Sequence, residues 1–161
     1  MKVRATRLLL ASIVCAIPIN LFAFEVGEIK SGMPQEEALQ RLRAQGFKIT
    51  QQKPSYFIAM RNRDARTAAF CNGRLVSFSY SVPGGVRGFI RRMSELSNQH
   101  GQGDVRASSS ETDVGELNSL SATWIFGTDT LRVEYLVGSQ RSSESQTVIW
   151  FTKSECSDRL K

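Results

Sequence analysis

Few residues of this chain have the types and spacing that enzymatic catalysis requires. It has a single histidine, His100, whereas a serine hydrolase needs a histidine base between its nucleophile and a third, orienting group. His100 precedes Gly101 at the end of an expected helix, where the helix dipole favours a positively charged side chain. We therefore interpret His100 as a solvated helix-end residue and not as a catalytic base.

Carboxylates are the remaining candidates for catalysis. They gather at Glu36 and Glu37, and at Glu111, Asp113 and Glu116. Paired carboxylates can hydrolyse a glycosidic bond, but the sequence does not give their separation in space. A helix start accounts for the first group and a solvated loop for the second, so a carboxylate-dependent hydrolase is the least favoured function. With one histidine, we expect neither a metal site nor a cofactor.

Residues 1–23 have the composition of a secretory signal peptide. Lys2, Arg4 and Arg7 precede a short apolar run, and the segment ends at the small residue Ala23. We expect cleavage near Ala23 and a periplasmic or secreted mature chain. Three of the 21 Lys and Arg residues are then lost, which lowers the net charge from +6 to +3. So small an excess does not imply a nucleic-acid partner.

Three other interpretations of this segment stay open. Cleavage after Ala16 would leave an apolar stub at the start of the mature chain and is less favoured than the later site. A retained membrane anchor needs about 20 consecutive apolar residues, and Pro18 and Asn20 interrupt the run. A lipoprotein would carry its lipid on Cys15, but the bulky Val14 stands where such sites have glycine or alanine. Cleavage at the later site is the favoured interpretation.

Cys71 and Cys156 are the two cysteines that remain after cleavage. In an exported chain, two cysteines most simply form one disulfide. The chain has no Cys-x-x-Cys motif, so a redox-active pair is disfavoured. We predict a structural Cys71–Cys156 bridge that holds the C-terminal tail against the middle of the fold.

The most unusual local composition lies in residues 61–66, at an expected hairpin connection. Arg61, Arg63 and Arg66 surround one aspartate there. An exposed basic tip of this kind suits an acidic protein surface or lipid headgroups. A solvated turn that keeps the sheet soluble is the competing and favoured interpretation. A nearby second helix would extend the patch with Arg87, Arg91 and Arg92.

Aromatic residues concentrate in the last three expected strands. Trp150 and Phe151 are adjacent, so they point to opposite faces of a strand. One belongs to the core, and the other is available to anchor a partner unless a helix or the N-terminal segment covers it. Core burial is the favoured interpretation. The partner-binding candidates on this sheet are Trp124, Tyr135 and Trp150.

Apolar periodicity predicts two helices and about seven strands. Pro34 suits the first position of one helix, which ends before Gly46. The second helix covers 86–99, with a core stripe of Phe89, Ile90, Met93 and Leu96. Asn72-Gly73 is a type I′ hairpin signal, whereas 104–118 is ambiguous between loop and strand edge. The expected strands are 47–51, 56–61, 67–71, 74–82, 122–126, 131–137 and 147–152.

These elements predict a single α+β domain over 24–161, with two helices packed on an antiparallel sheet. A helix followed by strands occurs twice, in 33–82 and in 86–152. No residue-level identity supports a true repeat, so two helix-plus-meander units are one of two open interpretations.

Residues 29–38, IKSGMPQEEA, resemble the opening of SmpA/BamE-type envelope proteins and of the β-lactamase-inhibitor-like fold. In those proteins a lysine, a Gly-Met pair and an acidic helix start lead into an antiparallel sheet. The chain departs from them in lacking a good lipidation site and in having Phe47-Lys48 after Gly46, where a Gly-x-Pro is usual. The resemblance implies binding to other proteins rather than catalysis, and it assigns no functional residue.

We therefore expect an exported, non-enzymatic protein-binding module, with an inhibitor or immunity-like protein as its concrete form. It would act through an exposed sheet face around Trp124, Tyr135 and Trp150, rimmed by the basic hairpin. The alternative is an envelope-associated structural or adaptor factor with its basic tip at a membrane surface.

Overall fold

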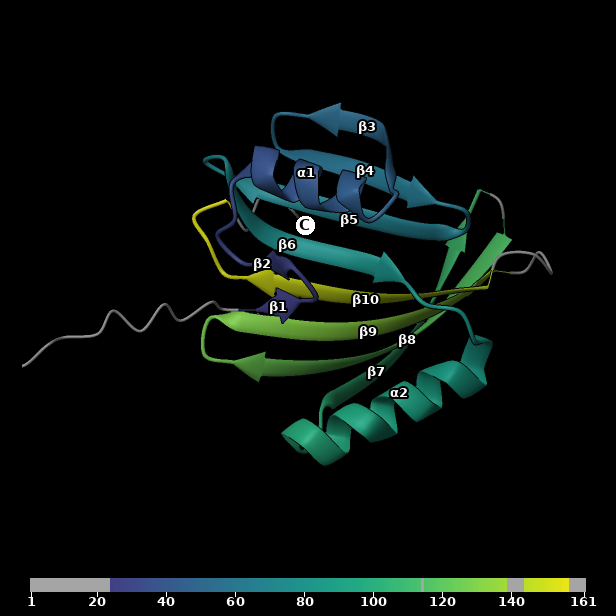
Figure 1. Cartoon of the computed structure of the whole chain (residues 1–161). Helices are drawn as coiled ribbons and strands as arrows, with labels where there is room; N and C mark the ends of the chain where they lie inside the picture. Colours follow the sequence, from purple (N-terminus) through teal and green to yellow (C-terminus); the bar gives the residue numbers. More distant parts are fainter. Residues whose placement is uncertain (1–23, 114, 139–143, 157–161) are drawn as a thin grey trace, which may run out of the picture.

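The computed structural model describes residues 24–113, 115–138 and 144–156, so the expected signal peptide lies outside it. This part of the chain forms two helices, α1 (Gln35–Ala44) and α2 (Gly85–His100), and two antiparallel sheets. The α+β fold class is confirmed, with strands predominating (Figure 1). Neither helix in these ranges has the length and apolar character needed to cross a membrane.

The large sheet has eight strands in the order β3-β4-β5-β6-β10-β9-β8-β7. Each helix is followed by a four-stranded meander, and the last strands of the two meanders, β6 and β10, pair with each other at the centre. The strands are β3 (Lys48–Lys53), β4 (Tyr56–Arg61), β5 (Asp64–Cys71), β6 (Arg74–Ser81), β7 (Asp104–Thr112), β8 (Gly115–Phe126), β9 (Asp129–Gly138) and β10 (Ser145–Thr152). The small sheet is a hairpin of β1 (Glu25–Val26) and β2 (Ile29–Lys30).

The sequence pattern does not predict the short strands β1 and β2, and it is ambiguous over strand β7. Strand β7 forms one edge of the large sheet, and all nine of its residues are exposed. An edge strand that faces solvent on both sides has no buried phase, so its sequence shows no apolar alternation. The ambiguous segment 104–118 is therefore β7 and the beginning of β8.

Both helices lie on the same face of the large sheet. Residues that oppose each other in an antiparallel pair share a face, and one such row crosses six strands. The row consists of Phe57, Ala68, Phe78, Trp150, Leu131 and Trp124. In α1, Ala38, Leu39 and Leu42 pack on the β3–β6 half of this row, and Phe89 of α2 packs on the other half. We call this the helix face and the opposite side the open face.

The β1–β2 hairpin covers the middle of the helix face at one end of the strands. Figure 1 shows it in front of β10 and β9, between the two helices. Phe24, just before β1, stacks on Trp150 at a ring separation of 6.1 Å. The N-terminal segment therefore closes the gap between α1 and α2 over Trp150.

Two local predictions can be compared with the geometry. Asn72 and Gly73 both have positive φ, at 50° and 72°, as a type I′ turn requires. The core stripe of α2 is narrower than expected, because Phe89, Met93 and Leu96 contact the sheet while Ile90 is 58% exposed. The assignment of Ile90 to the core is wrong, since only a narrow strip of α2 meets the sheet.

Cys71 at the end of β5 is bonded to Cys156, which follows β10, with a Cα–Cα separation of 5.7 Å. The predicted pairing is confirmed. The bond joins the β5–β6 hairpin to the segment after β10, and so reinforces the junction between the two meanders.

Reduction of this disulfide should destabilise the protein. The bond closes a loop of about 85 residues, and the chain-entropy model gives it roughly 4.5 kcal/mol. Urea unfolding of the oxidised chain and of the Cys71→Ala/Cys156→Ala variant measures the difference. Reduced wild-type chain is the control, because it lacks the disulfide but keeps the cysteine side chains that the alanines replace. Equal unfolding midpoints for oxidised and reduced chains would contradict the expected contribution.

Candidate functional site

The three aromatic partner-binding candidates all lie on the helix face. Trp124 and Tyr135 are 3% and 7% exposed beneath α2, and the Trp124 indole N–H donates to the Gly101 carbonyl at 2.9 Å. Trp150 is half-buried between the rings of Phe24 and Phe126. The expectation of an exposed face around these residues is wrong, because α2 and the N-terminal segment cover them.

The open face carries the side chains that alternate with those of the helix face along each strand. One row runs Tyr56, Ala69, Ser77, Phe151, Thr130 and Ile125, and the next runs Ile58, Thr67, Ser79, Ile149, Arg132 and Thr123. None of the described helices or hairpins packs against these rows. Ile125 is 74% exposed, and Ile58, Ile149 and Phe151 are half-buried by their neighbours in the sheet. Of the adjacent pair, Phe151 and not Trp150 therefore lies on the uncovered side, together with Tyr56.

The predicted basic tip is divided by the structure. Arg63 lies in the turn between β4 and β5, as expected. Arg61 and Arg66 instead fold back over the helix face, where their guanidinium groups lie 4.6 and 5.3 Å from the centre of the Phe47 ring. The register explains this, because Arg66 opposes Ala59 and thus shares its face. An exposed tip of three arginines is wrong, since Arg66 is largely packed.

Arg66 is held by two further contacts. Its guanidinium donates to the Asp64 carboxylate at 2.8 Å and lies 4.8 Å from the centre of the Tyr80 ring. Cation–π contacts of this kind are stronger where the pair is partly removed from water. The side chain is therefore fixed in position at the edge of a hollow in the helix face.

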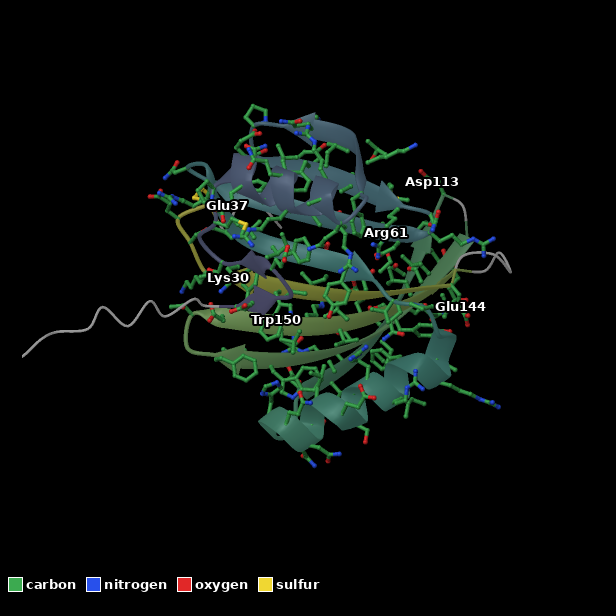
Figure 2. The ribbon with its side chains drawn as sticks, viewed as in Figure 1. Lys30, Glu37, Arg61, Asp113, Glu144 and Trp150 are labelled. Carbon is green, nitrogen blue, oxygen red and sulfur yellow. A yellow bond between two sulfur atoms is a disulfide. The ribbon has the colours of Figure 1, made fainter. Side chains whose placement is uncertain are left out.

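That hollow is a groove of about 820 Å³ between the β4–β5 hairpin and the first half of α2. It is lined by Arg63, Arg66, Tyr80, Arg92, Glu144 and Gln146, among others. Figure 2 shows Arg61 and Glu144 toward this end of the sheet and Trp150 toward the other. A larger basic patch requires that α2 lie near the β4–β5 hairpin. Arg92 meets this condition because it lines the same groove as Arg63 and Arg66, whereas Arg87 and Arg91 are exposed elsewhere on α2.

Two tyrosines at this site have perturbed acidity. Burial raises the pKa of Tyr80, and the positive charges of Arg92 and Arg66 oppose that increase. The Tyr135 hydroxyl donates to the Glu144 carboxylate, and this bond, with burial, raises the pKa of Tyr135. Both phenols therefore keep their protons at neutral pH and can act as hydrogen-bond donors.

Sequence reasoning missed Tyr80 and Gln146 as components of a site, and it named Arg92 only as a conditional extension of the basic patch. Tyr80 fitted a strand alternation and Arg92 a solvated helix face. Gln146 carried a usable signal, because it shares the buried phase of β10 with Val148 and Trp150. A polar residue in an otherwise apolar phase indicates a buried polar group that needs a partner.

The remaining chemical candidates have structural surroundings. Glu37 pairs with Arg41 at 2.8 Å, and Glu111 opposes Glu116 at the exposed end of the β7–β8 hairpin. His100 ends α2, is exposed, and contacts the Phe126 ring edge-on at 5.0 Å.

A carboxylate, that of Glu155, also lies beside Cys71 and Cys156. Both sulfurs belong to the disulfide, so they are not thiolate ligands for a metal ion.

Comparison of the chain with family models, with curated proteins and with solved structures found no match. The fold and the site therefore define the class of protein by themselves. They describe an α+β protein with an eight-stranded antiparallel sheet, covered on one face and uncovered by any described element on the other.

The burial of Trp124 predicts how the protein responds to its removal. Trp124→Ala should cost about 3–5 kcal/mol of unfolding free energy, because it empties a filled space beneath α2. Ile125→Ala changes the adjacent, exposed residue on the open face and should stay within about 0.5 kcal/mol of wild type. Urea unfolding followed by circular dichroism measures both variants. Similar stability of the two would contradict the assignment of faces.

Proposed function

We propose that the chain is an exported, non-enzymatic protein-binding module that binds a folded partner protein on the open face of its sheet. One observation carries the proposal. Both helices and the β1–β2 hairpin pack on the helix face, so the described structure leaves the open face without a cover. On that face apolar side chains alternate with serine and threonine across six strands. Apolar residues left without a cover, with Ile125 74% exposed among them, support a site of protein association.

The dimensions of the open face suit an interface. Eight strands about 4.8 Å apart and about eight residues long give roughly 34 by 27 Å, or about 900 Å². Each partner in a standard protein–protein interface contributes about 800 Å². The backbone of a sheet is already ordered by its ladder of hydrogen bonds, so binding would immobilise little additional chain.

The chemistry of the open face indicates the kind of partner. Charges on its β7–β9 side are paired in the Arg132–Glu134 bridge at 2.9 Å and the Arg106–Asp104 bridge at 2.8 Å. At the other edge, Lys53 lies 5.4 Å from the centre of the Tyr56 ring. Small residues such as Ser77 and Ser79 separate the apolar ones and permit close approach. The surface complementary to the β7–β9 side is a flat apolar patch without net charge. Its rim would carry carboxylates where it meets Arg63.

The topology supports the more specific part of the proposal. The two halves, 33–82 and 86–152, have the same order of one helix and four strands. Two stacked helix-plus-sheet units are the arrangement expected from the resemblance to β-lactamase-inhibitor-like proteins. An inhibitor or immunity-like protein is therefore the concrete form that we propose, and the N-terminal sequence with the Cys71–Cys156 bond supports a site of action outside the cytoplasm.

The alternative of an envelope adaptor at a membrane surface has less support. It depends on an exposed basic tip, and Arg61 and Arg66 are engaged by Phe47, Tyr80 and Asp64. Only Arg63 stands in the turn itself.

A charge placed on the open face should abolish partner binding without unfolding the chain. We would capture proteins from an extracytoplasmic extract of the source cells with wild type, Ile125→Asp and Ile90→Asp. Ile125 lies on the open face and Ile90 on α2, and both are strongly exposed. A specific partner should be held by wild type and Ile90→Asp and bind Ile125→Asp at least about ten-fold more weakly.

Capture of nothing by wild type would count against the proposal. So would a partner that Ile125→Asp holds as tightly as wild type does. Purified partner and calorimetry give the affinities, and circular dichroism verifies that each variant is folded.

A further inference from the structure

The groove on the helix face has a clear structural origin. The β1–β2 hairpin fills the space between α1 and α2 over Trp150, but no described element fills that space over Tyr80. The hollow left there measures about 820 Å³, which is within the range of about 300–1,000 Å³ found for small-molecule sites. It lies on the side of the sheet opposite to the proposed partner surface.

Positive charge predominates on the lining of the groove. Arg63 and Arg66 approach from the β4–β5 hairpin, and Arg92 approaches from α2. Within the described residues, no carboxylate pairs with Arg63. Arg92 pairs with Glu95 at 3.3 Å in a partly exposed bridge that is easily exchanged.

The carboxylates at the groove are already engaged. Asp64 accepts from Arg66 through one oxygen at 2.8 Å. Glu144 accepts from the Tyr135 hydroxyl and lies beside Gly85, the first residue of α2, where the helix dipole stabilises negative charge. Since Glu144 occupies the start of α2, the arginines are the groups left to attract an anion.

Several buried polar atoms in the wall of the groove have no hydrogen-bond partner among the described residues. They are both amide atoms of Gln146, Nε of Arg66 and Oδ1 of Asp64. Gln146 is only 3% exposed, and its register opposite Tyr135 places it on the helix face, toward the groove. Buried polar groups in folded proteins are nearly always paired, so this cluster indicates a partner that the described chain does not supply. Arg66 Nε and Gln146 Nε2 can donate to an oxyanion, whereas Asp64 Oδ1 and Gln146 Oε1 accept and need a donor such as a hydroxyl group.

We propose that the groove binds a small ligand carrying an oxyanion, either a carboxylate or a phosphate. Guanidinium groups bind both through paired N–H donors. Tyr80 adds a neutral phenol, and Gln146 adds both a donor and an acceptor for the rest of the ligand. Because these groups come from both meanders, a bound ligand would bridge the two halves of the sheet.

Citrate and inorganic phosphate, in separate titrations at constant ionic strength, are the probes. We expect at least one of them to bind the oxidised protein saturably and to raise its melting temperature by mass action. Arg92→Gln should weaken that binding at least about ten-fold. Arg91→Gln is the matched control, since it removes the same charge one residue earlier on α2, outside the groove.

Absence of saturable binding by both probes would overturn the proposal. Equal weakening in Arg91→Gln and Arg92→Gln would also overturn it, since the attraction would then be unspecific. Preference for citrate or for phosphate identifies the oxyanion. Ile125→Asp should bind the probe like wild type, which separates this site from the proposed partner surface.

The Gln146→Met variant distinguishes a ligand-binding role of Gln146 from a purely structural one, because melting temperature and probe affinity should change differently. Methionine has nearly the same shape without the unpaired amide, so the unliganded protein should melt at the same or a higher temperature. The affinity for the probe should fall. A lower melting temperature with unchanged probe affinity would assign Gln146 a structural role and contradict its place in the site.

Discussion

The pairing of β6 with β10 is the interaction on which the rest of this structure depends. It joins two meanders that would otherwise be separate sheets, and it places Phe78 opposite Trp150 and Tyr80 opposite Val148. A shift of the register by one residue would turn every side chain of one half to the other face. The observed register brings both apolar phases to the same side. For that reason one face receives α1, α2 and the N-terminal hairpin, and the other receives no described element.

The seam between β6 and β10 changes character along its length. Tyr80 and Trp150 are the two side chains that pack against both core clusters, so they connect the halves of the core. Trp150 is covered by Phe24 and Phe126, and its end of the seam is apolar. Tyr80 is contacted by Arg66 and lies at the groove with Gln146, and its end is polar. Apolar packing therefore stabilises one end of the seam, whereas charged and unpaired groups line the groove at the other end.

Local signals predicted the parts of the fold that depend on local chemistry. The pair Asn72-Gly73 predicted the hairpin, and the alternation from Val76 to Val82 predicted one central strand. Glycines predicted where both helices end. The sequence also predicted that Trp150 and Phe151 lie on opposite faces. It did not give the face that the helices cover, because that choice follows from the pairing of β6 with β10, whose residues lie about 70 positions apart. The aromatic candidates were assigned to the wrong side for this reason.

The candidate groove was still less accessible to sequence reasoning, because it combines residues from β5, β6, α2 and the start of β10. Close packing brings α2 over β10: a side chain at Gly88 would meet the Gln146 amide at 3.2 Å and the Pro83 carbonyl at 3.3 Å. Gly88 thus allows the helix to approach a buried amide that no described group satisfies. A core optimised only for stability would place an apolar residue at Gln146, as it does at Val148 and Trp150 on the same phase. The polar end of the seam therefore has a cost in stability, and a ligand that pairs with these groups accounts for that cost.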